Sequence, residues 1–215
     1  MSDPAIAHAA QFDDATQQRE AATFGMWVFL ATEILFFGGM FLGYAAYRRA
    51  YPAAFAAASR HTLLAFGATN TAVLLISSAM MAFAVRAARE KRRAALAWRL
   101  FATAALGLLF LGIKGFEYAR EFSEHLLPGA SFHFDPPYTN QAEMFFYLYF
   151  LMTGVHAIHV TIGVVLIAIF GSRAWHTDAF ARNDTAVDLL GLYWHFVDTV
   201  WVFLFPLIYL VERHS

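Results

Sequence analysis

The chain has no cysteine among its 215 residues, so disulfide bonds, iron–sulfur clusters and thiolate metal sites are all excluded. It is also poor in charge, because only 14% of its residues are Asp, Glu, Lys or Arg, against about 25% in a typical soluble domain. The formal net charge of -1 gives no support to nucleic-acid binding. Phosphate-binding glycine loops and nucleophile elbows are also missing, so the sequence carries no self-contained catalytic motif.

Hydrophobic residues are what the chain has in excess. They make up 60% of it, and Phe alone occurs 23 times. A soluble domain of this length leaves about a third of its surface in water, which is too much to be compatible with so many apolar side chains. The composition therefore indicates a lipid bilayer as the solvent, and it excludes a disordered chain.

Five stretches are long and apolar enough to cross a membrane, which takes about 20 residues. They are expected at about 24–47, 61–85, 97–118, 144–172 and 187–211. Because strand-like alternation does not occur, the sequence predicts an all-α polytopic bundle of five transmembrane helices and not a membrane barrel. Residues 1–23 form a polar segment without the apolar core of a signal peptide, and 212–215 form a short tail, so 24–211 is the expected membrane domain.

The basic residues predict the orientation, since Lys and Arg concentrate in cytoplasmic loops. With the N-terminus inside, nine fall in inner segments: Arg19, Arg86, Arg89, Lys91, Arg92, Arg93, Arg99, Arg173 and Arg182. Five fall in outer segments: Arg48, Arg49, Arg60, Arg120 and Arg213. We therefore expect the N-terminus inside and the C-terminus outside. The cluster from Arg86 to Arg93 is interpreted as a topology signal, with anionic lipid head groups as the alternative.

Ionisable side chains inside the spans are costly and are functional-site hypotheses by default. Counting about 1.5 Å of rise per helical residue predicts a polar layer in the inner half of the membrane. Its members are Glu33, His159, His195 and Asp198, with His156 nearer the middle. Hydrogen bonding between helices is the favoured role. A proton or lipid role, and haem or metal ligation by neutral imidazole, are the alternatives.

Other polar and small residues have narrower expected roles. Glu33 is either a protonatable, lipid-facing carboxyl or a neutral acid bonded to a Ser, Thr or His of another helix. Lys114 and Glu117 lie one turn apart, so we expect them to pair or to extend to the membrane interface. Gly39 and Gly43 form a small-xxx-small pair suited to close helix packing. Four tyrosines are expected in the outer interfacial belt: Tyr44, Tyr47, Tyr118 and Tyr209.

Several motifs resemble the cytochrome c oxidase subunit III family. Residues 154–163 read GVHAIHVTIG, and residues 193–203 read YWHFVDTVWVF, which is similar to the family's last helix. The span around Glu33 resembles the family's glutamate-bearing helix. Asn70 and Thr71 stand where the family has an Asn-Thr pair, and Glu117 with Tyr118 resembles its Glu-Tyr pair. The matches run in the family's order over about 24–209.

The chain also departs from the usual family pattern. It resembles the last five of the usual seven helices, and the two that it lacks form one arm of the family's lipid-holding cleft. Ala157 replaces a usual glycine, and Thr199 stands where valine is common.

The resemblance implies an accessory subunit of a bacterial haem–copper terminal oxidase, in the inner (plasma) membrane. The orientation predicted from the basic residues would then make the N-terminus cytoplasmic and the C-terminus periplasmic. Haem and copper would lie in the catalytic subunit, and the partners would be oxidase subunits I and II and membrane phospholipid, with no nucleic acid. This chain would carry no redox centre, stabilise the catalytic subunit, support proton uptake and bind phospholipid. The five residues of the polar layer would serve helix packing and a lipid or proton network, and Asn70 and Thr71 helix packing.

Other functions stay open at this stage. A quinol oxidase or a nitric oxide reductase complex would use a subunit of the same family. An independent haem-binding membrane cytochrome is a further alternative. A proton-coupled carrier using Glu33 is disfavoured, because such carriers are built from two repeats of spans.

Overall fold

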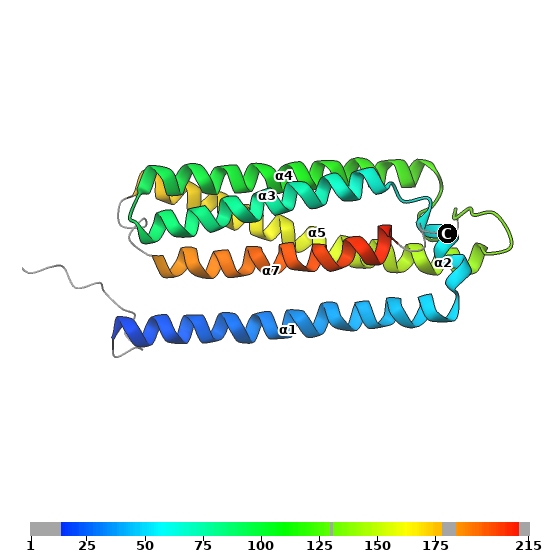
Figure 1. The fold of residues 1–215 in the computed structure, drawn as a ribbon, viewed down its shortest axis with the longest axis horizontal. Helices are drawn as coiled ribbons and strands as arrows, with labels where there is room; N and C mark the ends of the chain where they lie inside the picture. Colours follow the sequence, from blue (N-terminus) through cyan, green and yellow to red (C-terminus); the bar gives the residue numbers. More distant parts are fainter. Residues whose placement is uncertain (1–13, 130, 178–183, 211–215) are drawn as a thin grey trace, which may run out of the picture.

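The computed structural model describes residues 14–129, 131–177 and 184–210 (Figure 1). These residues form helices and no strands. The helices are α1 Ala15–Ala50, α2 Pro52–Ser59, α3 Leu64–Arg89, α4 Arg93–Ser123, α5 Thr139–His176 and α7 Asp184–Tyr209. All except α2 are long and apolar enough to cross a membrane, so the predicted five-helix membrane bundle is confirmed.

The helices extend beyond the apolar stretches that predicted them. Helix α1 begins at Ala15, and the side chain of Asp14 caps it by accepting a hydrogen bond of 2.7 Å from the backbone N–H of Gln17. The polar residues 15–23, predicted as a separate segment, are therefore the first turns of α1. Residues 1–13 and the predicted tail 212–215 lie outside the described residues. The sequence did not indicate α2, which begins with Pro52 at its first turn.

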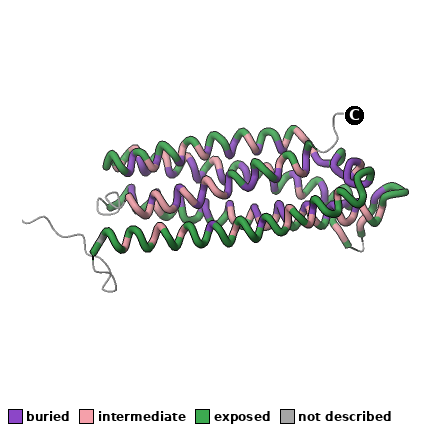
Figure 2. Tube along the Cα trace, turned by 60° about the horizontal axis from the view of Figure 1, so that its bottom comes forward, coloured by how far each residue is buried: buried purple, intermediate pink, exposed green. Residues whose placement is uncertain are grey.

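Four helices make the bundle, and α1 lies along one side of it (Figure 1, Figure 2). Helix α3 packs against α4 and α7, and α4 packs against α5. In the most apolar stretch of α1 only 11% of residues are buried, whereas 50% are buried in that of α7. Most of the side chains of α1 therefore face outward, toward whatever surrounds this chain in the membrane.

Trp194 of α7 fills the centre of the bundle. Its ring lies so close to Gly107 and Gly163 that a Cβ atom at either glycine would come within 2.9 Å and 2.7 Å of it. Its Nε1 donates a hydrogen bond of 3.2 Å to Ser77 Oγ of α3. One tryptophan thus joins α7 to α3, α4 and α5, and only glycine leaves room for it on α4 and α5.

Gly39 and Gly43, which were predicted to pack closely against another helix, do not do so within the described chain. A Cβ atom at Gly39 or Gly43 would meet nothing within 4 Å. Both glycines lie beside open space, on the helix that is least buried in the bundle. Within the described chain the predicted close packing at Gly39 and Gly43 is therefore wrong, and any such packing would need a partner.

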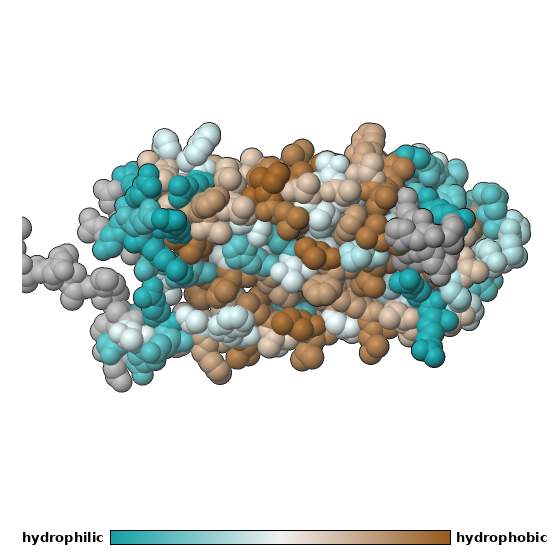
Figure 3. All heavy atoms as spheres, in the orientation of Figure 1, coloured by the Kyte–Doolittle hydropathy of each residue, from teal (hydrophilic) through white to brown (hydrophobic). Residues whose placement is uncertain are grey.

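Charged residues gather at the two ends of the molecule, and apolar residues cover its middle (Figure 3). At the turn between α3 and α4 the arginines are largely engaged within the chain. Arg86 donates to Glu90 over 2.7 Å, and this hydrogen bond lowers the pKa of Glu90. Arg89 pairs with Asp188 at 3.2 Å. The basic bias that predicts the orientation stays a prediction, and Arg182 and Arg213 lie outside the described residues.

Candidate functional site

Glu33 of α1 and His159 of α5 form a pair between two helices. Glu33 Oε2 lies 3.1 Å from His159 Nε2, and the two side chains are only 17% and 15% exposed. The other imidazole nitrogen, Nδ1, lies 2.9 Å from the carbonyl oxygen of Val155. Tyr193 of α7 donates a hydrogen bond of 3.0 Å to the carbonyl of His159, and the ring of Phe37 covers the imidazole at 5.2 Å.

The hydrogen-bond geometry shows which nitrogen of His159 carries a hydrogen. A carbonyl oxygen can only accept, so His159 Nδ1 carries a hydrogen and donates it to Val155. The contact between Nε2 and Glu33 Oε2 is then a hydrogen bond with a single proton, carried either by the carboxyl group or by the imidazole. The pair is thus a group that binds one proton at the α1–α5 interface. One interpretation of Glu33 from the sequence was an acid bonded to a Ser, Thr or His of another helix. His159 of α5 is such a partner.

His156 lies one turn away from His159 but belongs to a different environment. It is fully buried, and its ring stacks against Trp201 at 5.3 Å and meets the edge of Phe110 at 5.5 Å. Neither of its nitrogens has a hydrogen-bond partner among the described residues. The interhelical hydrogen bonding expected of this histidine is therefore replaced by aromatic packing.

His195 and Asp198, one turn apart on α7, differ in their polar contacts. His195 Nδ1 lies 2.7 Å from Ser78 Oγ of α3. Asp198 is 4% exposed, and neither of its carboxylate oxygens has a hydrogen-bond partner among the described residues. His195 therefore joins α7 to α3, whereas Asp198 is a buried carboxyl group without a hydrogen bond in the described part of the chain.

Within the predicted polar layer, hydrogen bonds join only Glu33 and His159 to each other in the described part of the chain. His195 bonds to Ser78 of α3, and His156 packs against aromatic rings. Counting residues along a helix gives the depth of a side chain but not the direction in which it points. That the members of the layer share one depth stays a prediction.

Lys114 and Glu117 form the most deeply buried ionic group in the described part of the chain. Lys114 Nζ lies 3.0 Å from Glu117 Oε2 and donates to the hydroxyls of Tyr149 at 2.8 Å and Tyr209 at 2.7 Å. Tyr209 in turn donates a hydrogen bond of 2.7 Å to Glu117 Oε1. The two charged side chains are 3% and 2% exposed. The predicted pairing is confirmed, and the alternative, extension to the interface, is wrong because tyrosines solvate the charges inside the bundle.

Sequence reasoning missed the two tyrosines of this group and a further buried carboxyl group on the same helix. Tyr209 was expected in the interfacial belt, but it is fully buried, and Tyr44 is too. Tyr149 lies in a stretch with many aromatic residues, and no sequence pattern set it apart from them. Glu121 is 4% exposed and lies one turn beyond Glu117 on the same helix face. Lys114, Glu117 and Glu121 follow each other at intervals of three and four residues, which puts them on one helix face. This spacing could have identified Glu121 from the sequence.

The Asn-Thr pair of α3 is divided between two environments. Thr71 Oγ1 accepts a hydrogen bond of 3.1 Å from Trp201 Nε1 of α7 and donates one of 2.8 Å to the carbonyl of Gly67. Asn70 is fully buried, and its amide atoms have no partner among the described residues. Thr71 thus makes the helix contact that was predicted for the pair.

The histidines do not fit a haem or metal site. Both nitrogens of His159 and the Nδ1 of His195 are engaged by other groups, while His156 is enclosed between two aromatic rings. No group of three His, Asp or Glu side chains that could hold a metal ion occurs in the described ranges. Within the described ranges the contacts of these residues are therefore with other helices, their own backbone and aromatic rings.

The fold and the site together define a polytopic membrane protein with two buried pairs of ionisable side chains, Glu33–His159 and Lys114–Glu117. The family model for cytochrome c oxidase subunit III matches residues 6–212. The chain belongs to this family, the third subunits of haem–copper oxidases.

Relatives cover nearly the whole chain. A cytochrome c oxidase subunit 3 from Thermostichus vulcanus is 32% identical over 209 residues, which are 95% of this chain and 94% of the relative. That from Synechocystis sp. is 32% identical over 189 residues, or 87% of this chain and 75% of the relative. A cytochrome bo(3) ubiquinol oxidase subunit 3 from Pseudomonas aeruginosa is 28% identical over 200 residues, or 93% and 89%. The chain thus has an extent similar to that of some of its relatives.

Proposed function

We propose that this chain is an accessory subunit of a bacterial haem–copper terminal oxidase of the cytochrome c oxidase type, without a redox centre of its own. The observation that carries the proposal is the match to subunit III over residues 6–212. The geometry supports it, because two pairs of buried ionisable groups, Glu33 with His159 and Lys114 with Glu117, make contacts within the helix bundle.

Glu33 and His159 are the proposed link to proton uptake. They hold one proton between two helices, at a position where each is still slightly exposed. A group of this kind can accept a proton from one side and release it to the other by rearranging a single hydrogen bond. We assign them the support of proton supply to the catalytic subunit, which carries haem and copper. His156, His195 and Asp198 are assigned to packing of the bundle helices.

The proposed partners are oxidase subunits I and II and membrane phospholipid. Helix α1 offers a surface for them, since only 11% of its most apolar stretch is buried within the chain. The proposed location is the bacterial plasma membrane with a cytoplasmic N-terminus, which follows the excess of Lys and Arg in the segments on that side.

A quinol oxidase is the second candidate for the partner enzyme. The similarity to a ubiquinol oxidase subunit 3, 28% over 93% of this chain, is close to the 32% found for cytochrome c oxidase subunits. Subunit III does not by itself distinguish the two, so the electron donor has to be read from the other subunits.

The test is to tag the chain, purify what it binds from native membranes in mild detergent, and record a reduced-minus-oxidised spectrum. We expect an a-type haem band and oxidation of cytochrome c. Haem b with haem o and oxidation of quinol would move the assignment to the second candidate, and haem b and c without oxygen consumption would move it to a nitric oxide reductase. The tagged chain expressed alone is the control. A haem spectrum from it, lost on His159→Ala or His195→Ala, would overturn the accessory role.

A further inference from the structure

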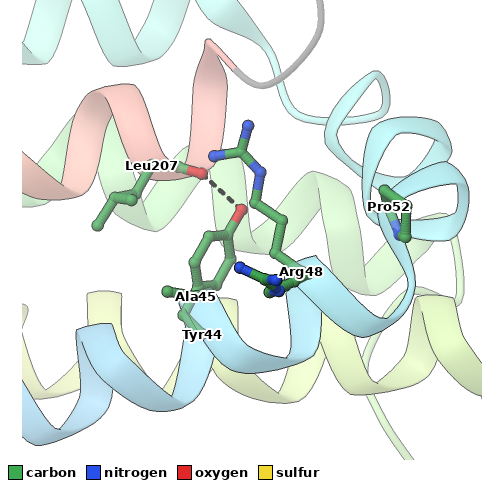
Figure 4. A pocket seen from close by; sticks show the side chains of 6 residues that line it. Tyr44, Ala45, Arg48, Pro52 and Leu207 are labelled. Atoms are coloured by element: carbon green, nitrogen blue, oxygen red, sulfur yellow. Dashed lines mark hydrogen bonds between the residues drawn. The ribbon is translucent and has the colours of Figure 1, made fainter.

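A pocket of about 330 Å³ opens where the ends of α1 and α7 meet the start of α2 (Figure 4). It is lined by Tyr44, Ala45, Arg48, Arg49, Pro52 and Leu207. The hydroxyl of Tyr44 donates a hydrogen bond of 2.5 Å to the carbonyl of Leu207, which ties α1 to α7 beneath the pocket. This hydrogen bond holds together the two helices that line the pocket. The pocket lies at the end of the apolar span of α1, where a membrane helix reaches the interface.

The two arginines in this pocket have no ion pair with any described residue. Arg48 is half-buried, and Arg49 is exposed in the last turn of α1. The arginines at the other end of the bundle differ, because Arg86, Arg89 and Arg92 each pair with an acidic side chain. The sequence nominated that other cluster for anionic lipid, but in the fold its charges are largely satisfied. Arg48 and Arg49 instead keep two guanidinium groups side by side in the chain that no acidic side chain of the described residues neutralises.

The lining of the pocket has a charge of one sign only. It holds the two guanidinium groups of Arg48 and Arg49 and no acidic side chain. The residue that α2 contributes, Pro52, adds an apolar ring to the wall. The pocket is therefore a concave site whose formal charge is positive.

We propose that this pocket binds the phosphate group of an anionic phospholipid, with Arg48 and Arg49 as its anion-binding residues. Guanidinium groups bind phosphate oxygens in a bidentate manner. The apolar wall of Ala45 and Leu207 and the position at the end of a span suit a lipid better than free phosphate. The proposal rests on the proposed function only in placing the chain across a membrane, so it can be tested on the chain alone.

The test is native mass spectrometry of the full-length chain in mild detergent, titrated with phosphatidylglycerol, phosphatidylcholine or inorganic phosphate. We expect phosphatidylglycerol to bind more tightly than phosphatidylcholine, and inorganic phosphate not to compete at equal concentration. Each basic residue near a membrane strengthens anionic lipid binding about fivefold. The double variant Arg48→Gln/Arg49→Gln should therefore bind phosphatidylglycerol on the order of 25-fold more weakly. The single variant Arg49→Gln should bind phosphatidylglycerol about fivefold more weakly. Because Arg49 is exposed, this variant is expected to fold, and it provides the test if the double variant misfolds.

Arg60→Gln is the matched control. Arg60 follows α2 at the same end of the bundle but does not line the pocket. It should leave the binding unchanged, and an equal loss there would mean that only the general surface charge matters, which overturns the site. Unchanged binding in the double variant overturns it as well, and binding of inorganic phosphate without phosphatidylglycerol overturns the lipid assignment. If the chain binds the lipid selectively but pulls down no oxidase, the proposed function is contradicted. The assignment of an anionic phospholipid to the pocket still holds in that case.

Discussion

Lys114 Nζ and Glu117 Oε2 lie 3.0 Å apart inside the helix bundle, with their side chains 3% and 2% exposed. Four aromatic rings surround the ammonium group, those of Tyr149, Tyr118, Tyr209 and Trp201, at 4.6 to 5.6 Å from the ring centres. Two tyrosine hydroxyls accept hydrogen bonds from it. The pair is therefore solvated by protein groups in place of water, and each charge depends on the other.

Replacing Lys114 by Met should destabilise the subunit strongly. The change leaves Glu117 as a buried charge without its cation, and breaking a buried pair in this way costs about 3–5 kcal/mol. Unfolding of the purified chain in detergent, followed by circular dichroism against denaturant, measures the loss. The control is Arg120→Gln, which removes an exposed pair with Glu124 and should cost less than about 1 kcal/mol.

The double variant Lys114→Met/Glu117→Leu should be more stable than Lys114→Met alone. Removing both partners leaves no unpaired charge from this pair, and apolar replacement of a buried pair is often close to neutral. The same unfolding measurement provides the comparison. A double variant that is less stable than the single one would mean that the stability comes from the tyrosine contacts of Glu117 and not from the ion pair.

Glu33→Ala should leave the subunit assembled but shorten the period over which the oxidase keeps turning over. The substitution removes the carboxyl group that shares a proton with His159, and we expect the proton supply to suffer before the fold does. Oxygen consumption by the purified complex, followed over many turnovers, measures this lifetime. An unchanged lifetime would remove Glu33 from the mechanism. Labelling of the folded wild-type subunit by a hydrophobic carbodiimide is a second measurement, and failure to label would argue against a protonated, lipid-accessible carboxyl group.

Gly163→Ala should destabilise the bundle, whereas Gly39→Ala should not. A methyl group at Gly163 would come within 2.7 Å of the Trp194 ring, and overpacking of this kind costs about 1–3 kcal/mol. At Gly39 the methyl group meets nothing within 4 Å. Thermal unfolding of both variants of the isolated subunit measures the difference. Equal stability would show that the ring moves aside freely. A loss of oxidase assembly with Gly39→Ala alone would place a partner against α1.

Thr71→Val should cost about 1–3 kcal/mol, because it leaves the buried N–H of Trp201 without its acceptor. Thr161→Val is the matched control, since Thr161 is exposed and bonds only to the carbonyl of Ala157 in its own helix. Unfolding of both variants in detergent, followed by circular dichroism against denaturant, measures the difference. If the two threonine variants are equally stable, the bond between α3 and α7 contributes nothing measurable.

Sequence periodicity and side-chain chemistry predicted different parts of this site with different success. The Lys114–Glu117 pair was predictable, because two residues three apart on a helix share a face whatever the tertiary structure. The partners of that pair, Tyr149 and Tyr209, come from positions 35 and 95 residues away in the chain, and no local pattern connects them. His156 and His159 are also three apart, yet one stacks on Trp201 and the other bonds to Glu33, because small rotations around a helix select different neighbours.

By itself the sequence determined that the chain crosses a membrane five times and that it resembles subunit III, since apolar length and motif order are properties of the chain and require no folding. It also determined which residues carry charge into the bilayer. Only the tertiary structure decided which of those charges meet. The packing of α1 against α5 made a proton-sharing pair of Glu33 and His159, and the meeting of α4, α5 and α7 enclosed Lys114. The physical reason is that depth along a helix follows from residue number, whereas direction and partner follow from how helices pack.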